Sequence, residues 1–266
     1  MSDPSTHQQA IMPFIELQSV DSTNNYAFAR IHAGLAQHGD VIFTREQWAG
    51  KGQMGKGWIA EKDTNILLSL IIKPATLPLS GQPDFNFAVA CGVHDFFARY
   101  AGSDTRIKWP NDLYWQDRKA GGVLIESIVG SQQSVVREEI KGNNGMVWEW
   151  AIVGIGININ QTVFDPKLPN PVSLKQITGK DFDTMDLAKE LSGSVSQYLE
   201  KVISGQTREV YDHYLECLYK RNEKVKLRKG TRVFEGIIKT VSPSGQLVVQ
   251  TSIEEHFDSG LIEWVI

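Results

Sequence analysis

The chain has 266 residues and 41% of them are hydrophobic, enough for one large domain with its own core and a small second domain. Its net charge is −4, from 31 acidic and 27 basic side chains, which argues against a dedicated nucleic-acid-binding protein because such proteins carry a surplus of positive charge. The longest apolar runs, such as residues 66–72, are too short to span a bilayer, and residues 1–10 lack the basic and apolar segments of a secretion signal. We therefore expect a cytoplasmic protein that binds neither nucleic acid nor membrane.

The N-terminal half of the chain alternates between helical and strand patterns. Asp21, Ser22 and Thr23 predict a helix cap ahead of residues 24–33, and Gly34 predicts the helix end. Apolar residues at helical spacing predict a long helix over residues 84–100. Apolar runs, of which NILLSLIIK is the clearest, predict strands at residues 41–45, 65–73, 107–109, 121–129 and 147–159.

The middle of the chain predicts a hairpin followed by two helices. The sequence GNNG at residues 142–145 is typical of a turn between strands at residues 134–140 and 147–153. Helical patterns then cover residues 184–203 and 207–221.

From residue 223 the sequence changes to short apolar runs separated by turns. KVKLR, RVFEGIIKTV, QLVVQT and EEHFDSGLIEWV predict strands, and Gly230 and residues 243–245 supply turns between them. About five strands of this length are typical of a small SH3-like barrel. We therefore expect two domains, over residues 1–221 and 222–266.

The segment AGKGQMGKGW, at residues 49–58, resembles a P-loop only in part. It matches G-x-x-x-x-G-K, but Gly57 stands where a serine or threonine binds magnesium. A P-loop also requires a helix after the loop, whereas a strand is predicted here. A glycine-rich loop between two strands can still hold an anion with its backbone amides and with Lys51 and Lys56. The same composition is found in hairpin tips whose lysines are merely solvated.

Three polar clusters lie in or beside predicted strands: KWPND, KAGGVLIE and GIGININ, at residues 108–112, 119–126 and 154–160. Buried charges are costly unless they are paired, so charged residues in such strands indicate either a functional site or an internal ion pair. One cluster alone fits a structural ion pair. Several clusters together with the glycine-rich segment favour a site.

In their order along the chain, these motifs resemble those of the biotin protein ligase family. The matching segments are S-T-N, Q-x-A-G-K-G, K-W-P-N-D, K-A-G-G-V-L-I-E and G-I-G-I-N, at residues 22–24, 47–52, 108–112, 119–126 and 154–158. The resemblance extends to the C-terminal strands. It implies an α+β fold in which helices flank a central mixed sheet, the class II synthetase-like biotin–lipoate ligase fold, with a C-terminal SH3-like barrel.

The resemblance implies an ATP-dependent ligase with two reaction steps. Biotin is first activated as biotinyl-5′-AMP, with ATP and Mg²⁺ required. The biotinyl group is then transferred to a lysine of a biotin carboxyl carrier protein domain of a biotin-dependent carboxylase. The enzyme is expected to be a monomer or a homodimer.

The family pattern also assigns residues. The catalytic residues are expected to be Lys119, Lys51 and Asp112, with Asp112 also a ligand of Mg²⁺. Biotin is expected to contact Ser22, Thr23, Asn24, Gln47, Gly50, Lys51, Gly52, Gln53, Lys119 and Gly122. ATP is expected to contact Lys51, Lys56, Trp58, Asn111, Asp112, Lys119 and Asn158.

The glycine-rich loop departs from the best-known form of the family, which has arginines where this chain has Lys51, Gln53, Met54 and Lys56. Lysine offers a point charge in place of bidentate hydrogen bonding by arginine. Regulatory members also carry an N-terminal helix-turn-helix, for which we find no room before the first motif, so operator binding is not expected. The basic segment at residues 220–232 is interpreted as a solvated strand face, with docking of an acidic carrier domain as the alternative.

Three other functions were weighed. Lipoate–protein ligases share the fold and chemistry, but KWPND, KAGGVLIE and the C-terminal barrel favour biotin. A P-loop NTPase is disfavoured by Gly57 and by the strand after it. A non-catalytic biotin-binding regulatory module would need no nucleotide site, yet the residues assigned to ATP are present.

The cysteines and histidines suggest no further chemistry at this level. Cys91 and Cys217 are expected to be buried thiols in a reducing compartment. The six histidines show no metal-ligand spacing such as H-x-x-x-H.

Overall fold

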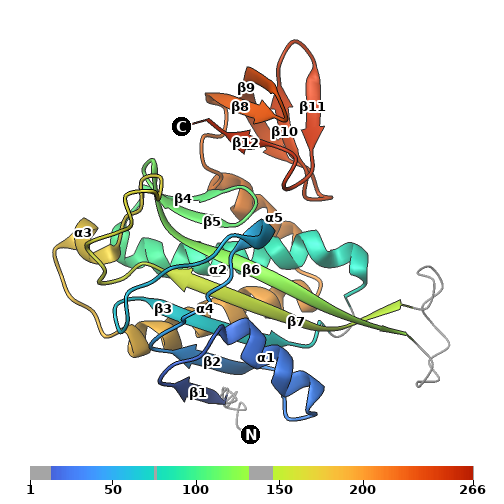
Figure 1. The fold of residues 1–266 in the computed structure, drawn as a ribbon. Helices are drawn as coiled ribbons and strands as arrows, with labels where there is room; N and C mark the ends of the chain where they lie inside the picture. Colours follow the sequence, from blue (N-terminus) through green and yellow to red (C-terminus); the bar gives the residue numbers. More distant parts are fainter. Residues whose placement is uncertain (1–12, 75–76, 132–145, 266) are drawn as a thin grey trace, which may run out of the picture.

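The computed structural model describes residues 13–74, 77–131 and 146–265. It contains a mixed seven-stranded sheet in the order β1-β2-β3-β7-β6-β5-β4 and a five-stranded antiparallel sheet in the order β11-β10-β9-β8-β12 (Figure 1). The helices are α1 (Thr23–His32), α2 (Gln82–Ala101), α3 (Leu174–Thr178), α4 (Thr184–Ile203) and α5 (Thr207–Glu216). The large sheet comprises β1 (Phe14–Leu17), β2 (Asp40–Thr44), β3 (Ile66–Ile72), β4 (Thr105–Lys108), β5 (Asp112–Trp115), β6 (Arg118–Ser131) and β7 (Met146–Ile157). The small sheet comprises β8 (Lys224–Lys229), β9 (Arg232–Val241), β10 (Leu247–Gln250), β11 (Glu254–Phe257) and β12 (Glu263–Trp264).

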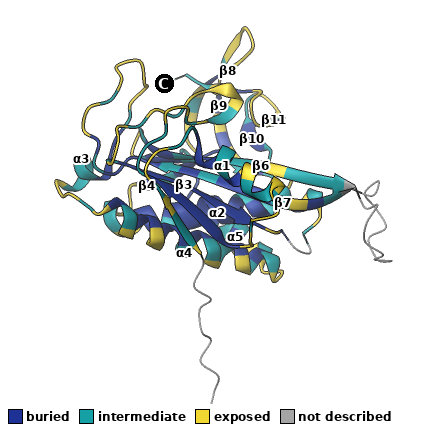
Figure 2. Cartoon of the chain, turned by 60° about the horizontal axis from the view of Figure 1, so that its bottom comes forward, coloured by how far each residue is buried: buried dark blue, intermediate teal, exposed yellow. Residues whose placement is uncertain are grey.

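The two faces of the large sheet are covered differently. On β3, Leu68 and Leu70 point into the main core, which contains the apolar side chains of α2 and α4, whereas Ile71 packs toward α1. All seven residues of β3 are buried, and Figure 2 shows β3 and most of α2 in the buried colour. On the other face, α1 packs mainly against β2, β3 and β7. It leaves most of this face over β6 and β5 uncovered.

The helical layer depends on a close crossing of α2 and α4. A Cβ atom on Gly92 would lie 2.6 Å from the Cα atom of Val195, so a side chain at this position would push the two helices apart. The Ser194 hydroxyl also donates a hydrogen bond of 2.9 Å to the Gly92 carbonyl. The crossing therefore requires glycine at residue 92.

The small sheet is attached to the large domain by side chains that bond to its backbone. Trp109 Nε1 donates to the Gly245 carbonyl at 2.9 Å, and the Tyr211 hydroxyl donates to the Val241 carbonyl at 2.6 Å. Figure 1 shows the small sheet beside the β4–β5 edge of the large one. It therefore lies over one end of the uncovered sheet face.

The expected α+β class, with a central mixed sheet and a small C-terminal β unit, is confirmed. The predicted helix over residues 207–221 is too long, because α5 ends at Glu216. The Cys217 carbonyl and the Tyr219 amide both bond to Ile107 of β4, which pulls the chain out of the helix. Three short elements, β1, β5 and α3, were not predicted. The predicted strand at residues 134–140 and the turn at 142–145 lie outside the described residues.

Within the described part of the chain, no helix is both long enough and apolar enough to cross a membrane.

Two glycine substitutions test the crossing of α2 and α4. Gly92→Ala should lower the free energy of unfolding by about 1–3 kcal/mol, because the added methyl group overpacks a backbone contact. Gly193→Ala, on the facing helix, should instead raise it by about 0.5–1 kcal/mol, because no atom lies within 4 Å of the new methyl group and alanine favours the helix. Urea unfolding of both variants checks this, and equal effects of the two substitutions would contradict the packing described here.

Candidate active site

A cavity of about 600 Å³ lies on the face of the large sheet that α1 leaves open. Its walls come from the start of α1, the glycine-rich loop, β5, β6, β7 and the segment of residues 259–264 in the small sheet. Most of the sequence-predicted site residues line it, namely Ser22, Thr23, Asn24, Gln47, Lys51, Gly52, Gln53, Lys56, Trp58, Asp112, Lys119, Gly122 and Asn158. Gly50 and Asn111 are not among its lining residues.

The end of the cavity beside α1 is a closed network of polar groups. Gln47 Oε1 accepts hydrogen bonds from the amide and hydroxyl of Thr23, at 2.7 and 3.1 Å. The Ser69 hydroxyl lies 2.7 Å from Thr23 Oγ1 and 2.6 Å from Asn24 Oδ1. Asn24 Nδ2 donates to Glu126 Oε2 at 2.7 Å. This end therefore offers fixed donors and acceptors to a small polar head group.

The position of α1 exposes this network. Ser22 is the N-cap residue of α1 but makes no capping hydrogen bond with its side chain. Ser22, Thr23 and Asn24 are each about 97% buried within the protein, yet all three line the cavity. The first turn of α1 is thus turned toward the ligand space.

The floor of the cavity is made of sheet positions that lack a side chain. A Cβ atom on Gly154 would lie 2.3 Å from Asn24 Oδ1, and one on Gly156 would lie 2.5 Å from Trp58 Cε2. Asn24 and Trp58 therefore reach the backbone of β7 only because both positions are glycine.

The glycine-rich loop folds back on itself between β2 and β3. Gly52 N donates to the Lys56 carbonyl at 2.6 Å, and Trp58 N donates to the Gly50 carbonyl at 2.9 Å. A Cβ atom on Gly50 would lie 2.4 Å from the Trp58 carbonyl oxygen, so this turn needs glycine there. The loop leads into a strand, not into a long helix, which agrees with the rejection of a P-loop.

Two side chains of the loop reach across the cavity. Lys51 Nζ lies 3.5 Å from Glu126 Oε1, and Gln53 Nε2 donates to Asn111 Oδ1 at 2.6 Å. Both side chains of the Lys51–Glu126 pair are about 40% exposed, so this pair contributes little to stability by itself. The contacts with β6 and with Asn111 hold the loop over the cavity.

An ion pair stands opposite the polar end. Lys119 Nζ lies 2.7 Å from Asp112 Oδ1, and Gly122 leaves room for it, because a Cβ there would lie 3.2 Å from the carboxylate. The same ammonium is 6.0 Å from the centre of the Trp58 ring. Trp58 Nε1 is one of two buried side-chain nitrogens in the described residues that have no hydrogen-bond partner. A buried N–H without a partner is costly, so this donor fits a ligand acceptor.

Asn158 supports this region from below. Its Nδ2 lies 3.1 Å from the Val172 carbonyl and 3.5 Å from the Lys119 carbonyl. The side-chain nitrogen of Asn158 therefore holds the segment before α3 against β6. What the structure shows directly is a positioning role for Asn158.

Lys108 is a buried cation at the end of the cavity near the small sheet. Its ammonium donates to the Tyr114 hydroxyl at 2.9 Å and lies 5.3 Å from the centre of the Trp264 ring. Burial lowers the pKa of Lys108 from its ordinary 10.5 to about 8; the charges of Lys119 and Lys56 act in the same direction, and Asp112 opposes them. Burial also raises the pKa of Tyr114, so its hydroxyl stays protonated.

Some residues of the cavity wall and of the polar network beside it were not among the predicted site residues. Ser69 is the one polar residue within the apolar run ILLSLII, and that interruption was a signal. Glu126 and Lys108 lie within the KAGGVLIE and KWPND motifs, but the family pattern assigns them no role. Residues 259–264 have no motif, because they reach the cavity only through the packing of the small sheet.

The fold is that of solved biotin protein ligases. The Aquifex aeolicus enzyme in complex with biotin and ATP superimposes with a TM-score of 0.75 at 23% identity, over 95% of this chain and 99% of that one. The Leishmania major enzyme in complex with biotinyl-5-AMP gives a TM-score of 0.61 at 20% identity, over 92% and 98%. The family model for the Biotin/lipoate A/B protein ligase family matches residues 16–148, and the chain belongs to this family.

The names of curated relatives agree with this family assignment. "Biotin--[acetyl-CoA-carboxylase] ligase" of Paracoccus denitrificans is 25% identical over 240 residues, which is 88% of this chain and 92% of the relative. "Bifunctional ligase/repressor BirA" of Escherichia coli is also 25% identical, over 88% of this chain and 68% of the relative. The Bacillus subtilis protein of the same name is 30% identical, but the match spans only 46% of its length. The chain thus spans about half of the Bacillus relative.

The buried Lys108 predicts a specific pH dependence of stability. Below about pH 8 its ammonium is charged in both the folded and the unfolded state, and the folded state bears the cost of burying it. Between pH 8 and 10.5 the folded state loses this proton first, so the free energy of unfolding gains a contribution that rises with pH.

Lys108→Met removes this contribution. The variant should be more stable than the wild type at pH 7, and the difference between them should shrink as the pH rises to 10. Urea unfolding at several pH values measures it, and Lys189→Met, on the exposed surface of α4, is the control. A pH-independent difference between wild type and Lys108→Met would show that Lys108 is not a buried ammonium.

Proposed function

We propose that this chain is an ATP-dependent biotin–protein ligase, which activates biotin as biotinyl-5′-AMP and transfers the biotinyl group to a lysine of a carrier domain. The observation that carries the proposal is one cavity with a network of hydroxyl and amide groups at one end and the Lys119–Asp112 pair opposite it. Such a cavity suits a ligand with a polar, uncharged head and a carboxylate that must meet a polyphosphate. Membership of the family and the names of the relatives support it.

The polar end suits the biotin head group. Gln47, Thr23 and Asn24 already hold one another at fixed distances, so they are organised before a ligand arrives. A ring carrying both N–H and C=O groups can pair with this mixture of donors and acceptors. The apolar part of the ligand would lie along the backbone of β7, where Gly154 and Gly156 leave space.

The cationic end suits the activation step. In that step a biotin carboxylate oxygen attacks the α-phosphorus of ATP, a new C–O–P bond forms, and pyrophosphate leaves. Two negatively charged groups must approach each other, so lysines that neutralise them lower the barrier. Lys119 lies beside Asp112 in the cavity wall, and Lys51 and Lys56 line the cavity from the loop. Trp58 Nε1 adds an unpaired donor at the same place.

Asp112 fits Mg²⁺ brought in with the nucleotide. Magnesium is commonly bound by one or two carboxylates together with substrate phosphates, and the Asp112 carboxylate is partly exposed inside the cavity. The ion would add positive charge at the phosphates. In the transfer step the carrier lysine would attack the acyl carbon, AMP would leave, and the same carboxylate would receive the proton of the attacking amine.

The partner and the location follow from the same proposal. The acceptor is a biotin carboxyl carrier protein domain of a biotin-dependent carboxylase, by analogy with the named activity of the relatives. We treat residues 1–221 as the catalytic domain and residues 222–266 as an SH3-like domain that completes the cavity wall. Cys91 and Cys217 are free thiols, which suits the reducing cytoplasm.

The substrate is tested by ATP–pyrophosphate exchange. Purified protein should catalyse exchange that depends on biotin, and lipoate should not replace it. Exchange that occurs with lipoate but not with biotin would show that the chain is a lipoate–protein ligase instead. Binding of biotin without any exchange would instead favour a non-catalytic binding module.

Lys119→Ala tests the activation step. The variant should lower the rate of biotinyl-AMP formation by on the order of 100-fold or more, the scale of losing one charged contact in a transition state. Transfer from pre-made biotinyl-AMP to the carrier should fall much less, because the mixed anhydride already exists. Single-turnover measurements of both steps separate the two effects.

Lys189→Ala is the matched control, since this lysine is exposed on α4 and, among the described residues, forms an ion pair with Asp186. It should leave both rates at the wild-type value. If Lys119→Ala forms biotinyl-AMP at the wild-type rate, or if both steps slow equally, Lys119 does not act specifically in the activation step.

A further inference from the structure

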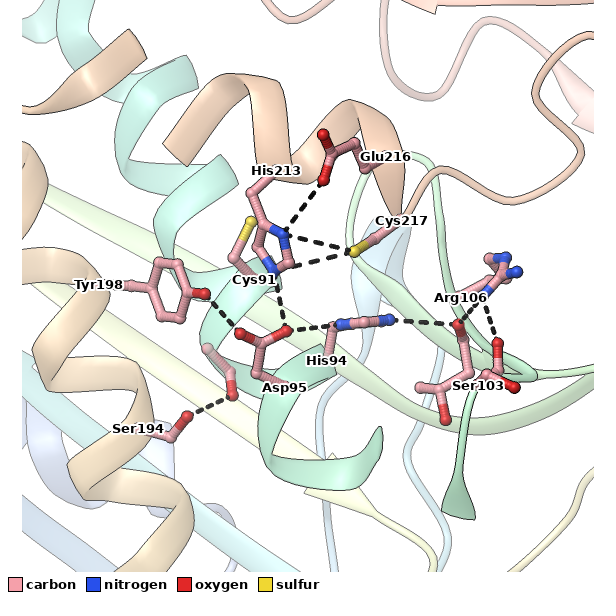
Figure 3. A network of polar contacts seen from close by, with 12 residues as sticks. Cys91, His94, Asp95, Ser103, Arg106, Ser194, Tyr198, His213, Glu216 and Cys217 are labelled. Atoms are coloured by element: carbon pink, nitrogen blue, oxygen red, sulfur yellow. Dashed lines mark hydrogen bonds and ion pairs between the residues drawn. The ribbon is translucent and has the colours of Figure 1, made fainter. Parts of the chain in front are cut away.

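Four side chains that commonly bind metal ions meet on the side of the sheet away from the cavity. His94 and Asp95 come from α2, His213 comes from α5, and Cys217 follows the end of α5 (Figure 3). One ligating atom from each lies within 4.8 Å of all the others. None of the four lines the cavity, so the proposed ligase chemistry leaves this cluster unexplained.

The donor atoms of the two histidines meet at one oxygen of Asp95. His94 Nδ1 and His213 Nε2 each lie 2.8 Å from the same oxygen, Asp95 Oδ1. Cys217 Sγ lies 3.8 Å from His213 Nε2. The ligating atoms of a tetrahedral zinc site with nitrogen and oxygen ligands are roughly 3.4 Å apart, given bonds of about 2.1 Å. Side-chain movements of less than about 1 Å would therefore bring the four atoms to zinc-binding positions.

Outer contacts hold the donors in this orientation. His94 Nε2 lies 3.1 Å from the Thr105 carbonyl, which leaves Nδ1 facing the cluster. The Tyr198 hydroxyl donates to Asp95 Oδ2, so Oδ1 is the oxygen left for the other partners. A carbonyl behind a ligating histidine and a hydrogen bond to a ligating carboxylate are the usual surroundings of a bound metal ion.

Burial and access also fit a metal site. Cys217 is 7% exposed and His94 is 8% exposed, whereas the side chains of Asp95 and His213 are about one-third exposed. The cluster is thus largely dry but open on one side, so an ion can enter the folded protein.

We propose that His94, Asp95, His213 and Cys217 bind one Zn²⁺ ion. Two imidazoles, a thiolate and a carboxylate form a mixed nitrogen, sulfur and oxygen set, which suits zinc better than the all-oxygen sites of magnesium or calcium. With four protein ligands the site is closed, so the ion has a structural role. Binding releases to solvent the thiol proton of Cys217 and any proton on the ligating nitrogens of His94 and His213, and no redox change occurs.

Zinc at this point would join three elements of the large domain. It would fasten α2 to the end of α5, and it would act on β4, because the Cys217 carbonyl accepts the Ile107 amide at 2.9 Å. α5 leads into the small sheet, so the ion would fix the segment from which that sheet begins. The expected effect is stabilisation of the fold in proportion to zinc binding.

The test uses the full chain, stripped with a chelator and then titrated. Equilibrium dialysis with zinc should give about one ion bound per chain, and zinc should raise the thermal unfolding temperature. Cobalt(II) in place of zinc should give a thiolate-to-cobalt absorption band, which only a cysteine ligand produces. Absence of bound zinc, or a cobalt complex without that band, would overturn the proposal.

Two cysteine variants locate the site. Cys217→Ser should abolish the cobalt band and weaken zinc binding by more than about 100-fold, since loss of an outer contact alone costs up to that much. Cys91→Ser is the matched control, because this buried thiol faces the Val210 carbonyl, not the four donors. It should retain the band and the zinc-dependent stabilisation. The reverse pattern would contradict the ligand set, and if Cys217→Ser fails to fold, the wild-type cobalt spectrum still decides whether a thiolate binds the ion.

Discussion

The cavity depends on one constraint, the absence of side chains at residues 154 and 156 of β7. Gly154 and Gly156 alternate with Val153, Ile155 and Ile157, which fill the core on the opposite face. One face of the strand therefore stabilises the fold while the other admits a ligand. Any larger residue at either glycine would collide with Asn24 or Trp58, the two side chains that border the ligand space.

Long elements with a single strong pattern were predictable from the sequence. The apolar run of β3 and the helical spacing of α4 can each be recognised without knowing which distant residues pack against them. Short elements were not predictable in the same way. β1 pairs in parallel with β2, and β5 has only four residues, so both owe their existence to neighbouring strands. The end of α5 is likewise set by bonds to β4, which helical periodicity cannot reveal.

In the candidate site too, features with a local sequence pattern were predictable and features set by packing were not. Ordered motifs identified most polar residues of the cavity, because the fold brings α1, the glycine-rich loop and the adjacent strands of the sheet together there. They did not identify the contribution of the small sheet, which follows only from packing. The cluster of His94, Asp95, His213 and Cys217 was also missed, because its halves are 118 residues apart and its local spacing is H-x-x-x-C instead of H-x-x-x-H.

The contacts of Glu126 connect the inner end of the cavity to the loop. One carboxylate oxygen accepts the Asn24 amide and the other lies near Lys51. A molecule that draws the Asn24 amide away would leave Lys51 as the main partner of Glu126, and a molecule that draws Lys51 away would strengthen the bond to Asn24. Occupancy of one end and position of the loop are thus energetically linked, and linkage of this kind is reciprocal. A single carboxylate that need not touch either molecule would then couple their binding.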